Sequence, residues 1–139
     1  MMRSACGFLL LLALPLSAAP IPKELRAGDE SRIVGVWHLK SAKFGDGDYT
    51  TAIGTKWTLG GDGKALRDRP NEGLGKAEFK IDPKATVKAF DWITDEGNTF
   101  LGVYELDGDT FRVTLATGAR PTACKPGDGA YHFEFRRAK

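Results

Sequence analysis

Long hydrophobic runs are rare in this sequence. The longest covers residues 8–16, about half of the roughly 20 apolar residues that a membrane-spanning helix needs, so no membrane span is expected. Arg3 precedes this run and small residues follow it at 17–19, which is the layout of a secretory signal peptide. The sequence therefore predicts a signal peptide over residues 1–19 and export to the periplasm or the extracellular space.

Cysteine is also scarce. The two cysteines are Cys6 and Cys124, and cleavage of the signal peptide would remove Cys6. A single remaining cysteine excludes an internal disulfide, so Cys124 is a buried side chain, a free thiol or an intermolecular link. The buried state is favoured, because an unpaired cysteine behaves as a small hydrophobic residue.

The sequence also lacks a large excess of either positive or negative charge. The chain has 20 Lys and Arg against 18 Asp and Glu, and the net charge of +2 falls to +1 without Arg3. The basic residues are scattered among acidic ones, so a nucleic-acid partner is not predicted. The sequence indicates no particular oligomeric state.

Motifs that carry chemistry are missing. There is no nucleophile elbow, zinc-protease motif or phosphate loop, so we expect neither an enzyme nor a cofactor. His38 and His132 have the outward parity of their strands and lack further ligands for zinc, so no metal site is predicted. Asp91 is expected to face outward, to face a turn or to form a salt bridge, rather than to be a buried functional group.

What the sequence does contain is alternation. From residue 33 onward, apolar and polar residues alternate and are interrupted by Gly, Asp, Pro and Asn, which is typical of short antiparallel strands. The mature chain is predicted to have a short helical lead-in over 20–32 and one all-β domain over 33–139. The fold predicted is an eight-stranded antiparallel up-and-down barrel, with a β-sandwich as the alternative. The expected strands are 33–44, 54–60, 64–69, 75–82, 86–94, 99–106, 110–116 and 130–137.

The most legible stretch is GVYELDGDTFRVTLA, residues 102–116. Its acidic spacing suggests a calcium loop, but the third liganding position, the later Gly and Glu, and the flanking helices of an EF-hand are missing. A two-residue hairpin turn at Asp107 and Gly108 explains it better. That turn would pair Leu106 with Asp109 and Tyr104 with Phe111.

This stretch, followed by RPT at 120–122, resembles an uncharacterised lipocalin-like domain family that is common in exported planctomycete proteins. The likeness extends to IVGVWHLKSAK at 33–43, FKIDP at 79–83, Asp91 and the last aromatic-basic strand, and it covers roughly residues 30–137. No activity is established for that family as a whole. The resemblance therefore implies a lipocalin-like barrel and export.

Gly35-Val36-Trp37 is similar to the G-x-W motif that opens lipocalin barrels, in which an Arg near the last strand crosses the Trp. Arg137 shares a parity with the inward aromatic residues of the last strand, so it could reach Trp37 if the first and last strands pair. The alternative is a core Trp37 without an Arg partner.

A barrel of this size either is filled by side chains or holds one small ligand. The favoured function is therefore an exported module that binds a small, mainly apolar molecule. The alternative is a packed envelope or extracellular interaction module without a ligand. A cavity of about 300 Å³ or more would favour binding. The side chains with inward parity, and hence the expected ligand-binding residues, are Trp57, Leu59, Phe79, Tyr104, Phe111, Val113 and Phe133; the orientation of Trp92 is ambiguous.

Overall fold

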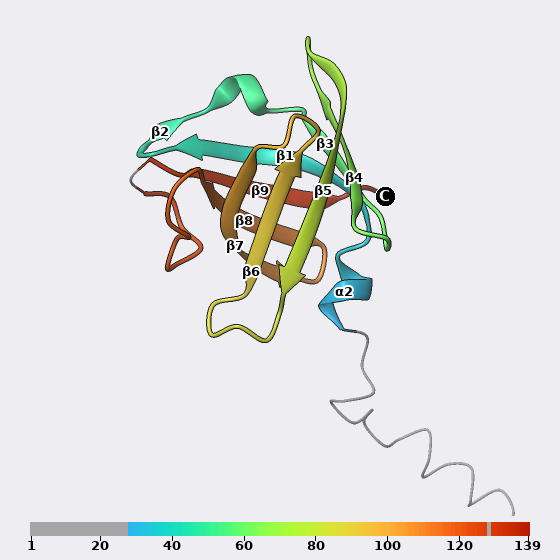
Figure 1. Cartoon of the computed structure of the whole chain (residues 1–139). Helices are drawn as coiled ribbons and strands as arrows, with labels where there is room; N and C mark the ends of the chain where they lie inside the picture. The colour runs from blue at the N-terminus through green and yellow to red at the C-terminus, as the bar shows by residue number, and fades with distance from the viewer. Residues whose placement is uncertain (1–27, 128) are drawn as a thin grey trace, which may run out of the picture.

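The computed structural model describes residues 28–127 and 129–139 (Figure 1). The predicted signal peptide and residues 20–27 of the predicted helix lie outside the described residues. Within them, no helix is long and apolar enough to cross a membrane. The elements in chain order are α2 Asp29–Arg32, β1 Gly35–Phe44, β2 Gly47–Asp48, the 3-10 turn η2 Thr50–Ala52, β3 Lys56–Leu59, β4 Lys64–Arg69, β5 Gly73–Asp82, β6 Ala89–Thr94, β7 Thr99–Asp107, β8 Thr110–Ala116 and β9 Tyr131–Arg137.

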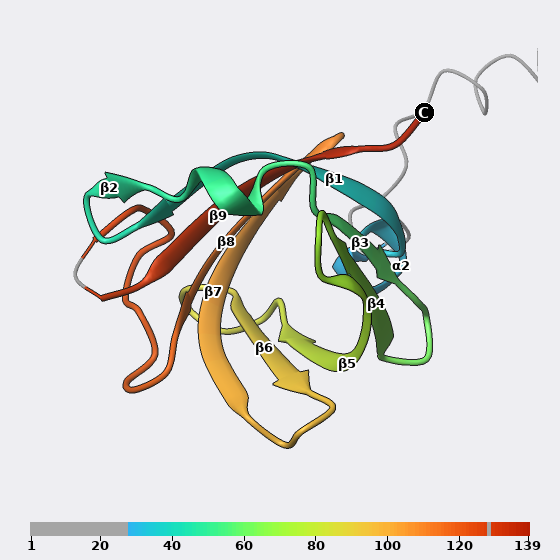
Figure 2. The ribbon, with the colours of Figure 1, turned by 90° about the horizontal axis from the view of Figure 1, so that it is seen from above.

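The strands close into a barrel. They form one antiparallel sheet in the order β2-β1-β3-β4-β5-β6-β7-β8-β9, and β9 also pairs with β1. The two-residue β2 lies outside the ring, as the view from above shows (Figure 2). The other eight strands enclose the interior. The predicted eight-stranded up-and-down barrel is confirmed, and the pairing of the first strand with the last excludes the sandwich.

Alternation along the strands places the core. On β3, Trp57 and Leu59 are buried while their neighbours are partly exposed, and the same alternation runs along β5 and β9. Phe111 on β8 is fully buried and packs against rings from three other strands, Trp37, Phe90 and Phe135, at centroid distances of 5.5 to 5.6 Å. Burial of these large apolar side chains is the main favourable term in the stability of the barrel.

The register of the β7–β8 hairpin differs from the prediction. Asp107 pairs with Thr110, Leu106 with Phe111 and Tyr104 with Val113, so the turn residues are Gly108 and Asp109. Gly108 has a φ of 59°, whereas Asp109 is not among the described residues with positive φ. That pattern fits a II′ turn, with Gly at the first central position, and not the predicted I′ turn. The pairing moved by two residues, which keeps every side chain on its predicted face.

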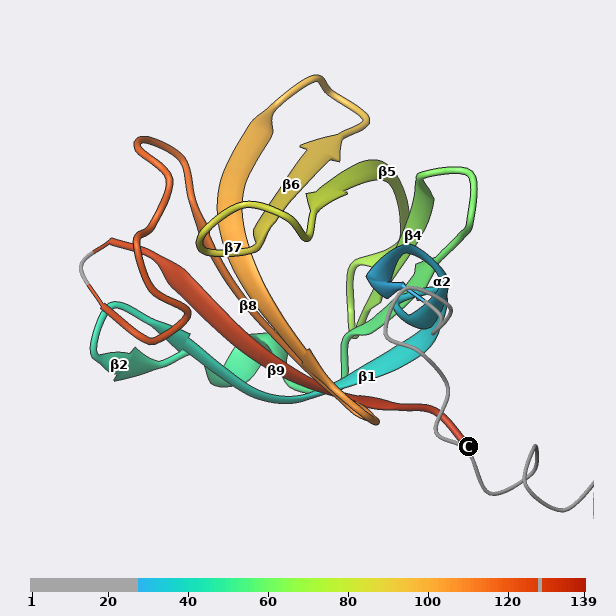
Figure 3. The same cartoon turned by 90° about the horizontal axis from the view of Figure 1, so that it is seen from below.

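The barrel departs from regularity beside β1. A bulge at Leu39–Ser41 shifts its register against β9, and β1 pairs with β3 over Gly35–His38 alone. Beyond that point η2 and its flanking residues cover the edge of β1, where the Leu39 amide donates to the Thr55 carbonyl at 2.9 Å. In Figure 1, η2 and the β4–β5 turn lie at the upper end of the barrel, while α2 lies at the lower end, which Figure 3 views from below.

Candidate functional site

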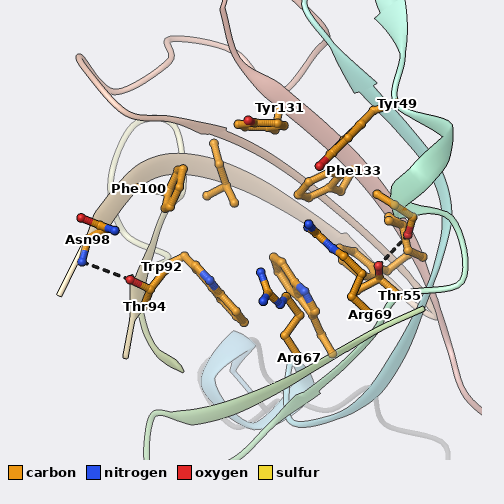
Figure 4. Close-up of a pocket in the computed structure, with 15 residues that line it drawn as sticks. Tyr49, Thr55, Arg67, Arg69, Trp92, Thr94, Asn98, Phe100, Tyr131 and Phe133 are labelled. Carbon is orange, nitrogen blue, oxygen red and sulfur yellow. Dashed lines mark hydrogen bonds between the residues drawn. The ribbon is translucent and has the colours of Figure 1, made fainter. Parts of the chain in front are cut away.

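A cavity of about 220 Å³ lies inside the barrel at the end away from α2 (Figure 4). Its volume is below the value of about 300 Å³ that we expected of a binding protein, so the interior is neither filled nor roomy. Strands β3, β4, β6, β7, β8 and β9 contribute to its wall, together with β1 and η2. Seven of the fifteen lining residues are aromatic: Tyr49, Trp57, Trp92, Phe100, Tyr131, Phe133 and Phe135.

The floor of the cavity is a stack of two indoles. The rings of Trp57 and Trp92 lie 4.1 Å apart between centroids and only 12° from parallel. Phe133 meets Trp57 edge-on at 6.0 Å. Trp92, whose orientation the sequence left open, is 5% exposed and points inward. Both indoles line the cavity, so this part of its wall is polarisable aromatic surface.

Two arginines from β4 form the polar wall, and sequence reasoning missed both. Arg67 and Arg69 project into the cavity from the same side (Figure 4). Arg67 lies directly opposite Trp57 in the ladder, so both side chains are on the inner face. The signal was present in the sequence, because Arg67 and Arg69 share the parity of Ala65, which is 4% exposed.

Two of the seven predicted ligand-binding residues, Trp57 and Phe133, line the cavity. The other five do not line it and lie in the packed part of the core: Leu59, Phe79, Tyr104, Phe111 and Val113. Parity assigns a side chain to the interior of a barrel, but it does not give the height along the barrel axis. The interior is filled towards α2 and open at the other end.

The filled end carries the residues expected to close the barrel. The Arg137 guanidinium lies 4.2 Å from the Trp37 ring centroid, and the Trp37 indole donates to the Ile33 carbonyl at 2.8 Å. Arg137 also donates to the carbonyls of Val34 and Arg32. Gly35 makes room for this contact, since a Cβ there would lie 2.8 Å from Arg137 Nη1.

A buried carboxylate fixes α2 to the same end. Asp29 accepts hydrogen bonds from the Tyr104 hydroxyl at 2.7 Å and from Lys88 Nζ at 2.9 Å, and it pairs with Arg32 at 3.1 Å. Burial acts to raise the pKa of Asp29, but these donors outweigh it and leave the pKa below its ordinary value. Burial and the Asp29 charge raise the pKa of Tyr104 far above the usual range. The group is a structural clamp, because its polar atoms are directed at one another.

Asp91 forms the salt bridge that was favoured for it, with Arg120 Nη1 at 2.6 Å. The same nitrogen donates to the Gly102 carbonyl at 2.8 Å, so the long β8–β9 connection is held against β7. A Cβ on Gly102 would lie 2.5 Å from the Thr114 carbonyl oxygen and 2.9 Å from that of Phe90. Glycine is therefore required where β7 passes close to both neighbouring strands.

Cys124, which was expected to be buried, is only partly buried and lies beside two polar side chains. Thr114 Oγ1 is 3.8 Å from Cys124 Sγ and 2.8 Å from His132 Nδ1. Burial raises the pKa of the Cys124 thiol to about 11 and lowers the pKa of His132. A thiol held protonated is a poor nucleophile. His38 pairs with Arg136 and His132 with Lys43, so the two histidines lie at different points along the β1–β9 ladder.

No group of three or more His, Cys, Asp or Glu side chains is placed to hold a metal ion in the described part of the chain. Comparison with family models, with curated proteins and with solved structures returned no match to this chain. The structure itself defines the class: a small antiparallel barrel of the lipocalin-like type, with one end filled and an aromatic cavity at the other.

Proposed function

We propose that this protein is an exported binding module for a small, mainly apolar molecule, held in the cavity above Trp57 and Trp92. The observation that carries the proposal is the asymmetry of the interior, which is filled towards α2 and hollow at the opposite end. The lining residues include no carboxylate, imidazole or thiol. That composition favours binding over catalysis, because these are the groups that most often serve in general acid-base chemistry.

The volume limits the ligand. An engineered apolar cavity of about 150 Å³ holds one benzene molecule, so about 220 Å³ has room for roughly nine non-hydrogen atoms. Burial of about 200 Å² of apolar surface makes about 5 kcal/mol available before association costs. We therefore expect a dissociation constant in roughly the high-micromolar to millimolar range for an apolar ligand.

Calorimetric titration with indole tests the proposal, because indole is neutral, planar and of the right size. Leu115→Trp should abolish binding, since Leu115 is 4% exposed and lines the cavity. Leu66→Trp on β4, where the side chain is 37% exposed, is the matched control and should leave binding unchanged. If neither indole nor a panel of similarly sized apolar molecules gives a saturable signal, the alternative of a packed interaction module replaces this proposal.

Export and family membership are part of the same proposal. Export is supported by the charged, apolar and small-residue order of residues 3–19, and membership of the lipocalin-like family by the quoted motifs and the barrel. N-terminal sequencing of the exported protein should find a mature terminus between about residues 18 and 23. Recovery of the protein with Met1 in place would contradict the export proposal.

A further inference from the structure

The polar wall of the cavity consists of two positively charged arginines, and some of their hydrogen-bond donors have no acceptor. The Nε atoms of both Arg67 and Arg69 are buried and find no hydrogen-bond acceptor in residues 28–127 or 129–139. A buried donor without an acceptor costs free energy, and each such group in a native protein needs an explanation, such as a bound water or ion. Both guanidinium groups point into the cavity (Figure 4).

The two arginines differ in their acidic partners. Arg69 pairs with Glu72 across the β4–β5 turn at 3.2 Å, and its guanidinium lies 5.9 Å from the centroid of the Tyr49 ring. Arg67 makes no ion pair with any carboxylate in the described residues, although it also borders a groove lined by Asp95 and Glu96. Since no acidic side chain lines the cavity itself, this wall favours an anion.

The remaining walls favour a ring. Trp92, Phe100 and Phe133 surround the space in front of the arginines, and Leu115 lies beside them. A ligand that uses both surfaces must be planar and apolar over most of its length and must end in a group with acceptors only. A carboxylate meets that requirement, because its two oxygens match the fork of donors on a guanidinium.

We propose that the ligand is a small aromatic carboxylate, with its ring against the stacked Trp57–Trp92 pair and its carboxylate accepting hydrogen bonds from Arg67 and Arg69. This inference rests on the proposed function and adds the charge and the polarity of the ligand to it. A benzoate-sized acid has about nine non-hydrogen atoms, which is the number that the cavity volume allows.

Benzoate and benzamide form the matched pair of probes, since they have nearly the same shape and differ in charge. In calorimetric titrations at pH 7 the wild-type protein should bind benzoate about tenfold or more tightly than benzamide. Arg67→Gln should reduce that preference to about threefold or less, because benzoate loses a charge-assisted contact and benzamide loses a weaker neutral one. Arg136→Gln is the control, because Arg136 is exposed on β9, and it should keep the full preference.

The outcomes separate the two proposals. Equal affinity for the two probes, or an undiminished benzoate preference in Arg67→Gln, overturns the carboxylate inference and leaves the binding function standing. Failure of benzoate, benzamide and indole alike overturns both. The comparison of the two probes needs only the wild-type protein, so it decides the inference even if Arg67→Gln does not fold.

Discussion

Replacing Arg137 with alanine should destabilise the barrel more than any other single change to an arginine of β9. The side chain is 29% exposed, and its guanidinium stacks on Trp37 and donates to two backbone carbonyls near α2. It also pairs with Asp109 at 3.3 Å, which links the last strand to the β7–β8 turn. The variant loses all four contacts and uncovers the face of the Trp37 ring on which Arg137 lies.

The magnitude follows from these contacts. A partly desolvated cation on an aromatic ring contributes about 1 kcal/mol, and the charge-assisted hydrogen bonds contribute about 1–2 kcal/mol together after water replaces them. The pair with Asp109 adds little, because Asp109 is 72% exposed. We expect a loss of about 2–3 kcal/mol in the free energy of unfolding, which for a domain of this size lowers Tm by about 10 °C.

Urea unfolding followed by tryptophan emission measures this loss. Arg136→Ala, one residue earlier and exposed, should change the free energy of unfolding by less than about 0.5 kcal/mol. Arg137→Lys should be intermediate, since it keeps the charge but loses the planar stacking surface. If Arg137→Ala and Arg136→Ala have equal and negligible effects, the closure of the barrel by Arg137 is refuted.

Three further predictions concern other parts of the fold. Gly102→Ala should cost about 3 kcal/mol or prevent folding, because its Cβ would meet backbone carbonyls on both sides, whereas Gly118→Ala, with nothing within 4 Å, should be nearly neutral in the same urea assay. Because the pKa of Asp29 is lowered on folding, its contribution to stability is fully present above the ordinary pKa of 3.8 and is lost as the pH falls through the lowered pKa. The stability difference between wild type and Asp29→Asn should therefore be large at pH 7 and shrink near pH 3. A difference independent of pH would contradict the clamp. Cys124, with a pKa of about 11, should react with a thiol reagent at pH 8 far more slowly in the native protein than in guanidinium, and similar rates in the two states would show that the thiol is not protected.

Much of the fold could be predicted because a barrel with a solvent-exposed outer face and an apolar interior imposes a period of two on every strand. The eight expected strands correspond to β1 and β3–β9, and the errors are at their ends. The β7–β8 register was wrong because an Asp-Gly-Asp sequence admits two adjacent turns that leave the faces unchanged, so the hydrophobic pattern cannot choose between them. β2 and η2 were missed because a two-residue strand and a single turn have no periodicity.

The site was harder to predict than the fold. Alternation identified Trp57 and Phe133 as inward, but it could not separate the cavity from the packed core, which depends on where α2 and the large rings fill the interior. Arg67 and Arg69 were overlooked because charged residues on a strand are usually assigned to its outer face. A consistent use of parity within β4, starting from Ala65, would have placed both of them inside.

The β1–β9 ladder joins residues about 100 positions apart in the chain, with Trp37 opposite Arg137. Contacts of such sequence separation form slowly, because a long loop must be ordered before they stabilise anything. A chain in which β9 has not yet left the ribosome therefore carries two unpaired sheet edges, on β1 and β8, and an uncovered Trp37. Such edges are templates for association with other chains. The barrel therefore cannot close until β9 is available for pairing. Truncation before Tyr131 should yield aggregation and not a partly formed barrel.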